Sequence, residues 1–508
     1  MMYTKAKHIV KKPIVKLKIG ERIMNMQRNL TLLTDLYQLT MMQGYYNNDT
    51  NNHEVVFDLF YRNNPSKNGY AICAGLSQAI EYIQNLAFNE ADIAYLESLN
   101  LFQKEFLEYL RGFKFTGDIY AIPEGTVVFP MEPLMRVKAP IFEAQFVETA
   151  LLNMINHQSL IATKAARVVR AAEGDPVLEF GLRRAQGPDA GIYGARAAMI
   201  GGCTGTSNVL TGQMFNVPVS GTHAHSWVMS FDEEIEAFRA YAKLFPDKCI
   251  LLVDTYDTLE SGVPNAIKVF DEMKASGVSM ASYGIRLDSG DLAYLSKKAR
   301  QMLDEAGHKE AIISASCDLD EMLIADLKRQ GAKITLWGVG TNLITSSDCP
   351  SFGGIYKLAA EMDEQGNEIP KIKISDNPEK VTNPGVKKLV RVYDKETGKI
   401  IADIIALEHE VFNENEPLVL YETKARWKKI KLKANAYTLR ELLVPVFEKG
   451  KLVYEVPETM EIRAYSKREL DTLWEEYKRL VNPQIMQVVL SDGLYALKEK
   501  MLENYKKD

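Results

Sequence analysis

Residues 282–291 read S-Y-G-I-R-L-D-S-G-D, a short apolar run that ends in Asp288 and is followed by serine, glycine and a second acid. From Asp291 to residue 306 the apolar side chains recur every three or four positions, as in a helix with one buried face. The stretch therefore predicts a buried strand, a polar turn and an amphipathic helix, which together form one β-α unit.

The same unit repeats through the middle of the chain. The runs 249–254 and 311–318 also end in aspartate, and Asp254, Asp288 and Asp318 lie 34 and 30 residues apart. Further candidate strands are expected at 177–181, 198–202, 217–221 and 333–338. Serial β-α units form a parallel sheet, and about seven of them favour a β/α barrel, with an open doubly wound sheet as the alternative.

The segments on either side of this region have different patterns. After about residue 353 the β-α alternation stops, and residues 386–407 predict a β-hairpin that turns at E-T-G-K. Before the repeats, the expected elements are a helix at 34–47, a strand at 54–61, helices at 75–87, 90–98 and 102–111, short strands within 117–138, and helices at 140–156 and 158–172.

Bulk composition excludes several classes of protein. A hydrophobic content of 46% and a charged content of 25% are usual for a soluble globular protein, and a net charge of −6 argues against a general nucleic-acid binder. No run approaches the roughly 20 apolar residues of a membrane-spanning helix, so no membrane partner is expected. The five cysteines lack a C-x-x-C pair, which indicates a reducing cytoplasm and no structural zinc. Cys203, Cys249 and Cys317 lie in or beside apolar runs and are expected to be buried.

A cluster of cations departs from this acidic average. Its members lie between residues 164 and 196 and are Lys164, Arg167, Arg170, Arg183, Arg184 and Arg196. Such a cluster suits anions, either phosphates or carboxylates. The alternative is a set of solvated helix faces without a ligand.

The functional groups of a β/α barrel gather where its strands end. Asp254, Asp288 and Asp318 end strands, and three carboxylates on one rim would suit Mg²⁺ or sugar hydroxyls. The glycine-rich ends at 201–208 and 337–341 would let backbone N–H groups close on a phosphate. Three further aspartates stand just before helical segments, where N-capping is expected: Asp257, Asp291 and Asp320.

Two of the seven histidines, His223 and His225, stand one residue apart in G-T-H-A-H at the end of a candidate strand. Both could bind Zn²⁺ in a metal-dependent barrel hydrolase, but none of the other five histidines ends a barrel strand to complete such a site. The other interpretations are one reactive histidine beside a phosphate, acting as base or nucleophile, and a buried hydrogen-bonded pair.

Eight motifs, in order along the chain, carry a resemblance to a known family. They are L-T-D-L-Y-Q-L-T-M (33–41), T-K-A-A-R-V-V (163–169), E-F-G-L-R-R (179–184), G-T-S-N-V (205–209), G-T-H-A-H-S (221–226), R-L-D-S-G-D (286–291), G-V-G-T (338–341) and K-I-S-D-N-P-E-K-V-T-N-P-G (373–385). With these motifs the chain resembles the nicotinate phosphoribosyltransferases, a type II phosphoribosyltransferase family, and the resemblance runs from about residue 29 to at least 390.

The resemblance implies an α/β fold of two parts. An irregular TIM-like β/α barrel with the active site is expected over 141–352. An open-faced β-sheet (α+β) domain is expected from the N-terminal segment 29–140 and the C-terminal segment 353–508, which also adds a helical tail. Residues 1–28 lack the pattern of a signal peptide. They are expected to form a disordered N-terminal extension that belongs to neither part.

The implied reaction joins nicotinate to 5-phosphoribosyl 1-pyrophosphate, giving nicotinate mononucleotide and pyrophosphate in NAD salvage, coupled to ATP hydrolysis with Mg²⁺. The resemblance makes His225 the phosphorylated histidine and Asp288 a catalytic residue and Mg²⁺ ligand, in a cytoplasmic homodimer with a shared active site. Residues implied for nicotinate are Tyr37 (from the other subunit), Phe180, Arg183, Ser207, Thr222 and Arg286. Residues implied for the sugar pyrophosphate are Asp254, Asp318, Gly338, Gly340 and Thr341.

The nearest rival is nicotinamide phosphoribosyltransferase, which carries an acidic residue where this chain has Ser207 in G-T-S-N. A carboxylate there would accept from the amide NH₂ of nicotinamide and repel the carboxylate of nicotinate. Ser207, with arginines nearby, therefore favours the acid.

Overall fold

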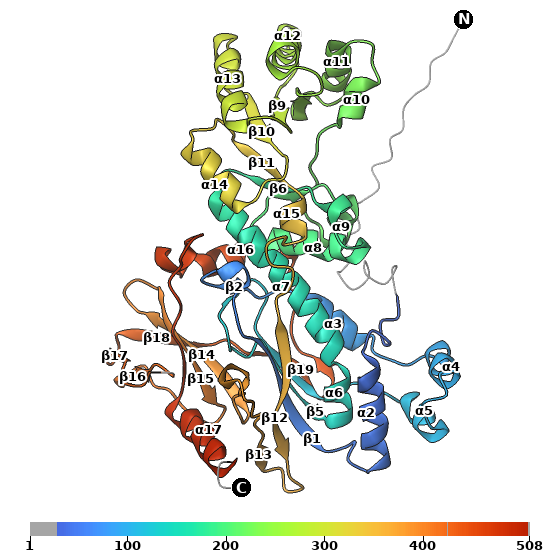
Figure 1. The fold of residues 1–508 in the computed structure, drawn as a ribbon, viewed down its shortest axis with the longest axis vertical. Coiled ribbons are helices and arrows are strands. Elements are labelled where there is room, and N and C mark those ends of the chain that lie inside the picture. Colours follow the sequence, from blue (N-terminus) through green and yellow to red (C-terminus); the bar gives the residue numbers. More distant parts are fainter. Residues whose placement is uncertain (1–27, 424, 506–508) are drawn as a thin grey trace, which may run out of the picture.

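The computed structural model describes residues 28–423 and 425–505 (Figure 1). Figure 1 shows an elongated molecule with a parallel sheet and its helices at one end and mainly antiparallel sheets at the other, where β15 and β21 form the parallel exception. The extension predicted for residues 1–28 lies outside the described residues, apart from Arg28. The predicted boundaries after residues 140 and 352 stay predictions.

The parallel sheet has the strand order β7-β6-β11-β10-β9-β8, and every neighbouring pair is parallel. It curls, and the β/α barrel predicted from the serial units is confirmed as this incomplete barrel. Its strands are β6 (Val177–Glu179), β7 (Gly205–Thr206), β8 (Cys249–Leu252), β9 (Tyr283–Leu287), β10 (Ile312–Ala315) and β11 (Leu336–Val339). The helices of this end are α8 (Pro188–Ile200), α9 (Val209–Phe215), α10 (His225–Met229), α11 (Glu234–Leu244), α12 (Val263–Ala275), α13 (Leu292–Glu305), α14 (Glu321–Arg329) and α15 (Thr341–Ile344).

Two predicted strands of the barrel are wrong. Residues 198–202 end the buried helix α8, and a short apolar run does not distinguish a buried helix from a buried strand. Residues 217–221 make only one isolated parallel bridge, between Val219 and Thr206. Pro218 lacks the N–H that would continue this ladder.

The antiparallel end is built from both ends of the chain, as predicted. One sheet has the order β13-β12-β1-β5-β3-β19-β20, and another has the order β18-β14-β15-β21. The strands of the first sheet are β1 (Glu54–Tyr61), β3 (Asp118–Ala121), β5 (Met135–Pro140), β12 (Gly354–Met362), β13 (Glu368–Pro370), β19 (Val444–Glu448) and β20 (Lys451–Leu452). The second contains the predicted hairpin, with strands β14 (Lys387–Asp394), β15 (Ile400–Leu407), β18 (Tyr437–Glu441) and β21 (Val488–Leu490).

Smaller pairs and helices complete this end. The paired strands are β2 (Ala71–Ile72) with β4 (Val127–Val128) and β16 (Leu418–Tyr421) with β17 (Lys429–Leu432). The helices are α2 (Leu36–Asn47), α3 (Leu76–Gln84), α4 (Glu90–Ser98), α5 (Lys104–Leu110), α6 (Ile141–Phe146), α7 (Glu148–Ala171), α16 (Thr459–Asp471) and α17 (Asp492–Tyr505).

Helix α7 connects the two ends of the molecule. The Ser159 and Thr163 hydroxyls accept hydrogen bonds from the main-chain N–H groups of Ala74 and Ile72, at 3.0 and 2.9 Å. The sequence predicted two helices separated near residue 157. The break instead lies at Val147, because the run 148–171 contains no glycine or proline and most of its length is buried.

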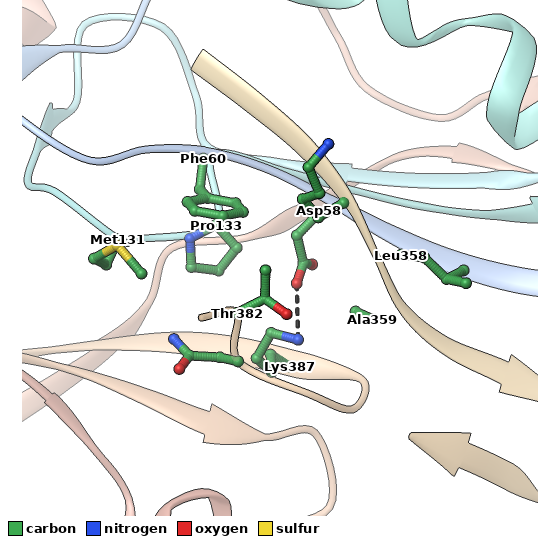
Figure 2. A pocket seen from close by; sticks show the side chains of 10 residues that line it. Asp58, Phe60, Met131, Pro133, Leu358, Ala359, Thr382 and Lys387 are labelled. Atoms are coloured by element: carbon green, nitrogen blue, oxygen red, sulfur yellow. Dashed lines mark ion pairs between the residues drawn. The ribbon is translucent and has the colours of Figure 1, made fainter. Parts of the chain in front are cut away.

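A buried ion pair fixes the start of the hairpin against the large sheet. The Nζ atom of Lys387 on β14 lies 2.8 Å from Oδ2 of Asp58 on β1, and both side chains are buried. Lys387 also donates to the main-chain oxygen of Gly385 at 2.5 Å. Figure 2 shows the two side chains pointing toward one another, with Thr382 beside them. The pair therefore holds the end of the 373–385 motif close to β1.

A second buried network supplies a stability prediction. The fully buried Arg391 donates to Asp403 at 2.9 and 2.7 Å, to Glu469 at 3.2 Å and to the Val127 carbonyl at 2.7 Å. Arg391→Met would leave the Asp403 carboxylate buried without a cation, so we expect the free energy of unfolding to fall by about 3–5 kcal/mol in urea titrations. Arg329→Met, which removes an exposed ion pair with Asp326, is the control and should leave the midpoint of urea unfolding nearly unchanged. Equal losses in the two variants would contradict the prediction.

Candidate active site

One cavity of about 360 Å³ lies at the carboxyl ends of the parallel strands. It gathers the segments that follow β6, β7 and β9 and the G-T-H-A-H segment that leads into α10. Seven of the predicted site residues line it: Phe180, Arg183, Ser207, Thr222, His225, Arg286 and Asp288. The carboxyl ends of the parallel strands therefore bring together residues that are far apart in the sequence.

Arg286 is the centre of the polar network in this cavity. Its Nη1 donates to the Thr222 hydroxyl at 2.9 Å, its Nη2 to Oδ1 of Asp288 at 2.9 Å, and its Nε to the Ser316 hydroxyl at 2.8 Å. Three donors on three sides fix the plane of the guanidinium. Its two remaining N–H groups can face a ligand without rearrangement.

His225 begins α10 and lies between a hydroxyl and a carboxylate. Its Nδ1 is 3.1 Å from Oγ1 of Thr255, and its Nε2 is 3.8 Å from Oδ2 of Asp288. Partial burial by itself raises the pKa of Asp288, but hydrogen bonds from Ser316 and Arg286 and the charge of Arg286 outweigh it and lower this pKa. Asp288 is therefore ionised and can stabilise a protonated or substituted imidazole ring.

The three strand-end carboxylates, Asp254, Asp288 and Asp318, differ in their surroundings. Asp254 accepts from the main-chain N–H of Asp288 at 2.7 Å and from the Ser289 hydroxyl at 2.8 Å, while its Oδ1 is buried without a hydrogen-bond partner. Asp318 is exposed. In the described part of the chain, no group of three or more His, Cys, Asp or Glu side chains is arranged to hold a metal ion. These residues therefore form no metal site of three carboxylates, and the role predicted for them at Mg²⁺ or sugar hydroxyls stays a prediction.

The N-capping prediction for the other three aspartates is confirmed. Asp257 accepts from the N–H groups of Leu259 and Glu260, and this cap starts a short π-helical turn. Asp291 caps α13 at 3.0 Å and Asp320 caps α14 at 2.7 Å. Their carboxylates serve the helices, whereas the strand-end Asp288 lines the cavity.

The backbone is strained in the turn that follows β10. Cys317 and Asp318 have φ values of 94° and 36°, a region that residues other than glycine rarely adopt. Cys317, which the apolar run predicted to be buried, is exposed on this turn. The turn leaves Ser316 directed at Arg286 and Asp288, and the Asp318 carbonyl accepts from Nδ2 of Asn342 at 2.8 Å.

The glycines after β11 pack beside the cavity. A Cβ on Gly338 would lie 2.7 Å from the ring of Phe180, so glycine is required there for that ring to fit. The main-chain N–H of Phe180 donates to the carbonyl of Val339 at 2.8 Å. Gly340 precedes Thr341, the first residue of α15. The phosphate role predicted for Gly338, Gly340 and Thr341 stays a prediction.

Most of the predicted anion-binding cluster is already paired. Lys164 and Arg167 are buried against Glu321, and Arg196 is buried against Glu124. Arg170 pairs with Glu475 on the surface. The cluster prediction is wrong for these four cations, because their acidic partners lie far away in the sequence. Arg183 and Arg184 are exposed, and Arg183 lines the cavity.

Sequence reasoning missed Thr255, Ser316 and the role of Glu179. The first two are hydroxyl residues within two positions of a strand-end aspartate, a signal that could have found them. Glu179 is buried, accepts from the Thr206 hydroxyl at 2.6 Å and from the N–H of Gly181, and burial raises its pKa. It fixes the turn on which Phe180 and Arg183 stand.

Tyr37 lies on α2, with 47% of its surface exposed, and does not line the cavity. A role for it at the nicotinate ring therefore requires a second subunit and stays a prediction.

His223 is a buried neutral histidine. Its Nε2 accepts the main-chain N–H of Leu252 at 3.2 Å, so it is not free to bind a metal. The two-histidine hydrolase hypothesis is therefore wrong. Burial lowers the pKa of the ring to about 4; the hydrogen bond to the Ala224 carbonyl acts against this, and the charge of the neighbouring Arg286 acts in the same direction as burial.

This pKa sets a pH dependence of stability. The unfolded ring titrates near 6.5, so the contribution of neutral His223 is complete above pH 6.5 and is lost as the pH falls toward 4. Relative to His223→Gln, which does not titrate, the wild type should lose on the order of 3 kcal/mol of unfolding free energy over that window. Urea unfolding of both proteins between pH 7.5 and 4 measures it. A difference that does not change with pH would contradict the assignment.

Comparison with known proteins agrees with the motifs. Three family models match: the nicotinate phosphoribosyltransferase (NAPRTase) N-terminal domain over residues 32–156, the NAPRTase family over 176–397 and the C-terminal domain over 386–498. A nicotinate phosphoribosyltransferase of Bacillus subtilis is 48% identical over 478 residues, covering 94% of this chain and 96% of its own length. One from Caenorhabditis elegans is 35% identical and covers 93% of each chain.

A solved structure gives the same result for the fold. The crystal structure of human nicotinic acid phosphoribosyltransferase superposes with a TM-score of 0.80 at 29% identity, covering 92% of this chain and 99% of that one. Among the described residues, no helix is long and apolar enough to cross a membrane. The family models and the relatives together establish that the chain belongs to the nicotinate phosphoribosyltransferase family.

Proposed function

We propose that the enzyme transfers the phosphoribosyl group of 5-phosphoribosyl 1-pyrophosphate to nicotinate, and that it couples this transfer to ATP hydrolysis through His225. The observation that carries the proposal is the cavity in which His225, Asp288, Arg286 and Thr222 meet. In the transfer, the C1–oxygen bond breaks with its electron pair on pyrophosphate, and the pyridine nitrogen attacks the oxocarbenium-like carbon. Positioning of that nitrogen is the main catalytic demand.

The pyridine ring of nicotinate would stack on the ring of Phe180, with the carboxylate of nicotinate directed toward arginine side chains. Arg183 is exposed at the cavity, and Arg286 keeps two N–H groups unused by its internal hydrogen bonds. Ser207 adds a neutral hydroxyl on the same wall. Tyr37 of a second subunit would cover the opposite face of the ring, which makes a homodimer part of the proposal. Arginine forks and a site without a carboxylate at position 207 favour the acid over the amide.

His225 would carry the phosphoryl group on Nδ1. Asp288 faces Nε2 and would favour the tautomer with its proton there, which leaves the Nδ1 lone pair toward Thr255. That lone pair attacks the γ-phosphorus of ATP, the bond to the bridging oxygen breaks, and ADP leaves with the electron pair. Water later releases phosphate and restores the ring. Binding energy from ATP thus changes the affinity for the sugar pyrophosphate.

The carboxylates of Asp254 and Asp288 would suit a Mg²⁺ ion that binds together with the pyrophosphate group of the sugar substrate. Mg²⁺ in such sites takes one or two protein carboxylates and substrate phosphate oxygens. The unpartnered Oδ1 of Asp254 and the carboxylate of Asp288 would supply this pair. The ion would neutralise charge on the leaving pyrophosphate. Asp318 with Gly338, Gly340 and Thr341 would hold the ribose and its 5-phosphate, and a cytoplasmic location remains part of the proposal.

A competition assay tests the substrate. Equal concentrations of nicotinate and nicotinamide are incubated with the enzyme, 5-phosphoribosyl 1-pyrophosphate, ATP and Mg²⁺, and the two mononucleotides are separated and counted. We expect nicotinate mononucleotide to dominate. Preferential formation of nicotinamide mononucleotide would overturn the proposal in favour of the rival activity.

A further inference from the structure

The parallel sheet has an unpaired edge beside the cavity. Within residues 28–423 and 425–505, strand β8 pairs only with β9, and the N–H groups of Cys249 and Val253 both donate toward the β9 chain, at 3.0 and 3.2 Å. Because N–H directions alternate along a strand, the N–H of Leu252 points to the opposite, open side. A buried N–H without a partner there would be costly.

The connection between α9 and α10, which is seen in Figure 1, contacts the sheet at both edges. Its main chain pairs with the other edge of the sheet, since Thr206 on β7 donates to the Pro218 carbonyl at 3.0 Å and accepts from Ser220 at 2.9 Å. Three residues later, Nε2 of His223 accepts the Leu252 N–H at 3.2 Å. One segment thus contacts both edge strands, with its backbone on β7 and with a side chain on β8.

The imidazole ring of His223 is held firmly enough to act as such a link. It is 8% exposed and packs edge-on against Tyr241, with ring centroids 4.7 Å apart. Its Nδ1 lies 3.5 Å from the carbonyl of Ala224, so the ring proton belongs on Nδ1 and the acceptor lone pair on Nε2. The residues on either side of this link, Thr222 and His225, both line the cavity.

We infer that His223 is a positioning residue, which closes the parallel sheet at its open edge through the Leu252 N–H and so fixes the places of Thr222 and His225 in the cavity. Thr222 then meets Nη1 of Arg286, and His225 meets Asp288 and Thr255. The part of the inference that concerns catalysis rests on the proposed function. The part that concerns the sheet edge does not.

Three measurements test the inference. In wild type with ¹⁵N-labelled histidine, the ring shifts of His223 should report a neutral ring with its proton on Nδ1. In His223→Phe, which keeps an aromatic ring but no acceptor, amide exchange at Leu252 should become at least tenfold faster and the KM for nicotinate should rise about tenfold. His223→Gln, whose amide oxygen can accept the same N–H, should restore both values to within about threefold.

His308→Phe is the matched control, because His308 is also buried and hydrogen-bonded, to Asp271 and Tyr283, but lies outside the cavity. It should lower the melting temperature and leave the KM for nicotinate unchanged. A proton on Nε2 of wild-type His223, unchanged Leu252 exchange in His223→Phe, or equal KM effects in the two phenylalanine variants would overturn the inference. If the wild type lacks transferase activity, the proposed function fails, while the ring shifts and the exchange rates still decide whether the edge is closed.

Discussion

His225→Ala is expected to abolish the transfer of radioactive phosphate from γ-labelled ATP to the protein. In the wild type the label should be labile in acid and stable in base, as a phosphorus–nitrogen bond requires. The variant should also lose the increase in sugar-pyrophosphate affinity that ATP causes, and should keep a slow transfer that does not depend on ATP. The physical reason is that this substitution removes the proposed nucleophile, which lies between Thr255 and Asp288, and leaves the residues proposed to contact nicotinate, Arg286 and Phe180, unchanged.

The control for this experiment is His409→Ala, an exposed histidine outside the cavity, which should label as the wild type does. Labelling is measured on purified protein after acid and base treatment, and affinity from the KM for 5-phosphoribosyl 1-pyrophosphate with and without ATP. If ATP still lowers that KM in His225→Ala, the phosphohistidine role is wrong, whatever the transfer rate.

The parts of the fold that could be predicted are those in which local pattern and burial agree. The strand 54–61 and the hairpin within 386–407 have long apolar runs with clear turns, and the structure has them at those places. The caps Asp257, Asp291 and Asp320 followed from their places just before helices. The strand predicted at 198–202 was wrong because a fully buried helix end and a buried strand have the same composition.

The prediction of an anion-binding cluster of cations was wrong for a different reason. Lys164, Arg167 and Arg196 have buried acidic partners, Glu321 and Glu124, that are 72 to 157 positions away, and no local pattern contains that information. It could be predicted that the cavity residues lie together, because strand ends in a parallel sheet meet at one edge. The closing of the open edge by a side chain could not be predicted, because it depends on a distance that only the folded chain sets.

The other large effect is expected at Ser207. Ser207→Asp would add a second carboxylate to the lining of the cavity, where Asp288 is the acidic side chain now, beside the segments of Phe180 and Thr222. Like charges brought together in a partly desolvated site cost several kcal/mol, so kcat/KM for nicotinate should fall at least 100-fold, or roughly 3 kcal/mol. The same carboxylate can accept from the amide of nicotinamide, so the ratio of the two kcat/KM values should shift toward the amide by a larger factor.

Ser207→Asn separates the charge from the size of the new side chain. Asparagine has nearly the same shape as aspartate but no charge, so its loss of kcat/KM for nicotinate should be about tenfold or less. The main-chain N–H of Ser207 donates to the carbonyl of Glu179 at 3.0 Å, which keeps the backbone in place in both variants. If the two variants lose nicotinate activity equally, crowding is the cause and the charge argument fails. If only the aspartate variant does, the absence of a carboxylate at position 207 is what admits the acid.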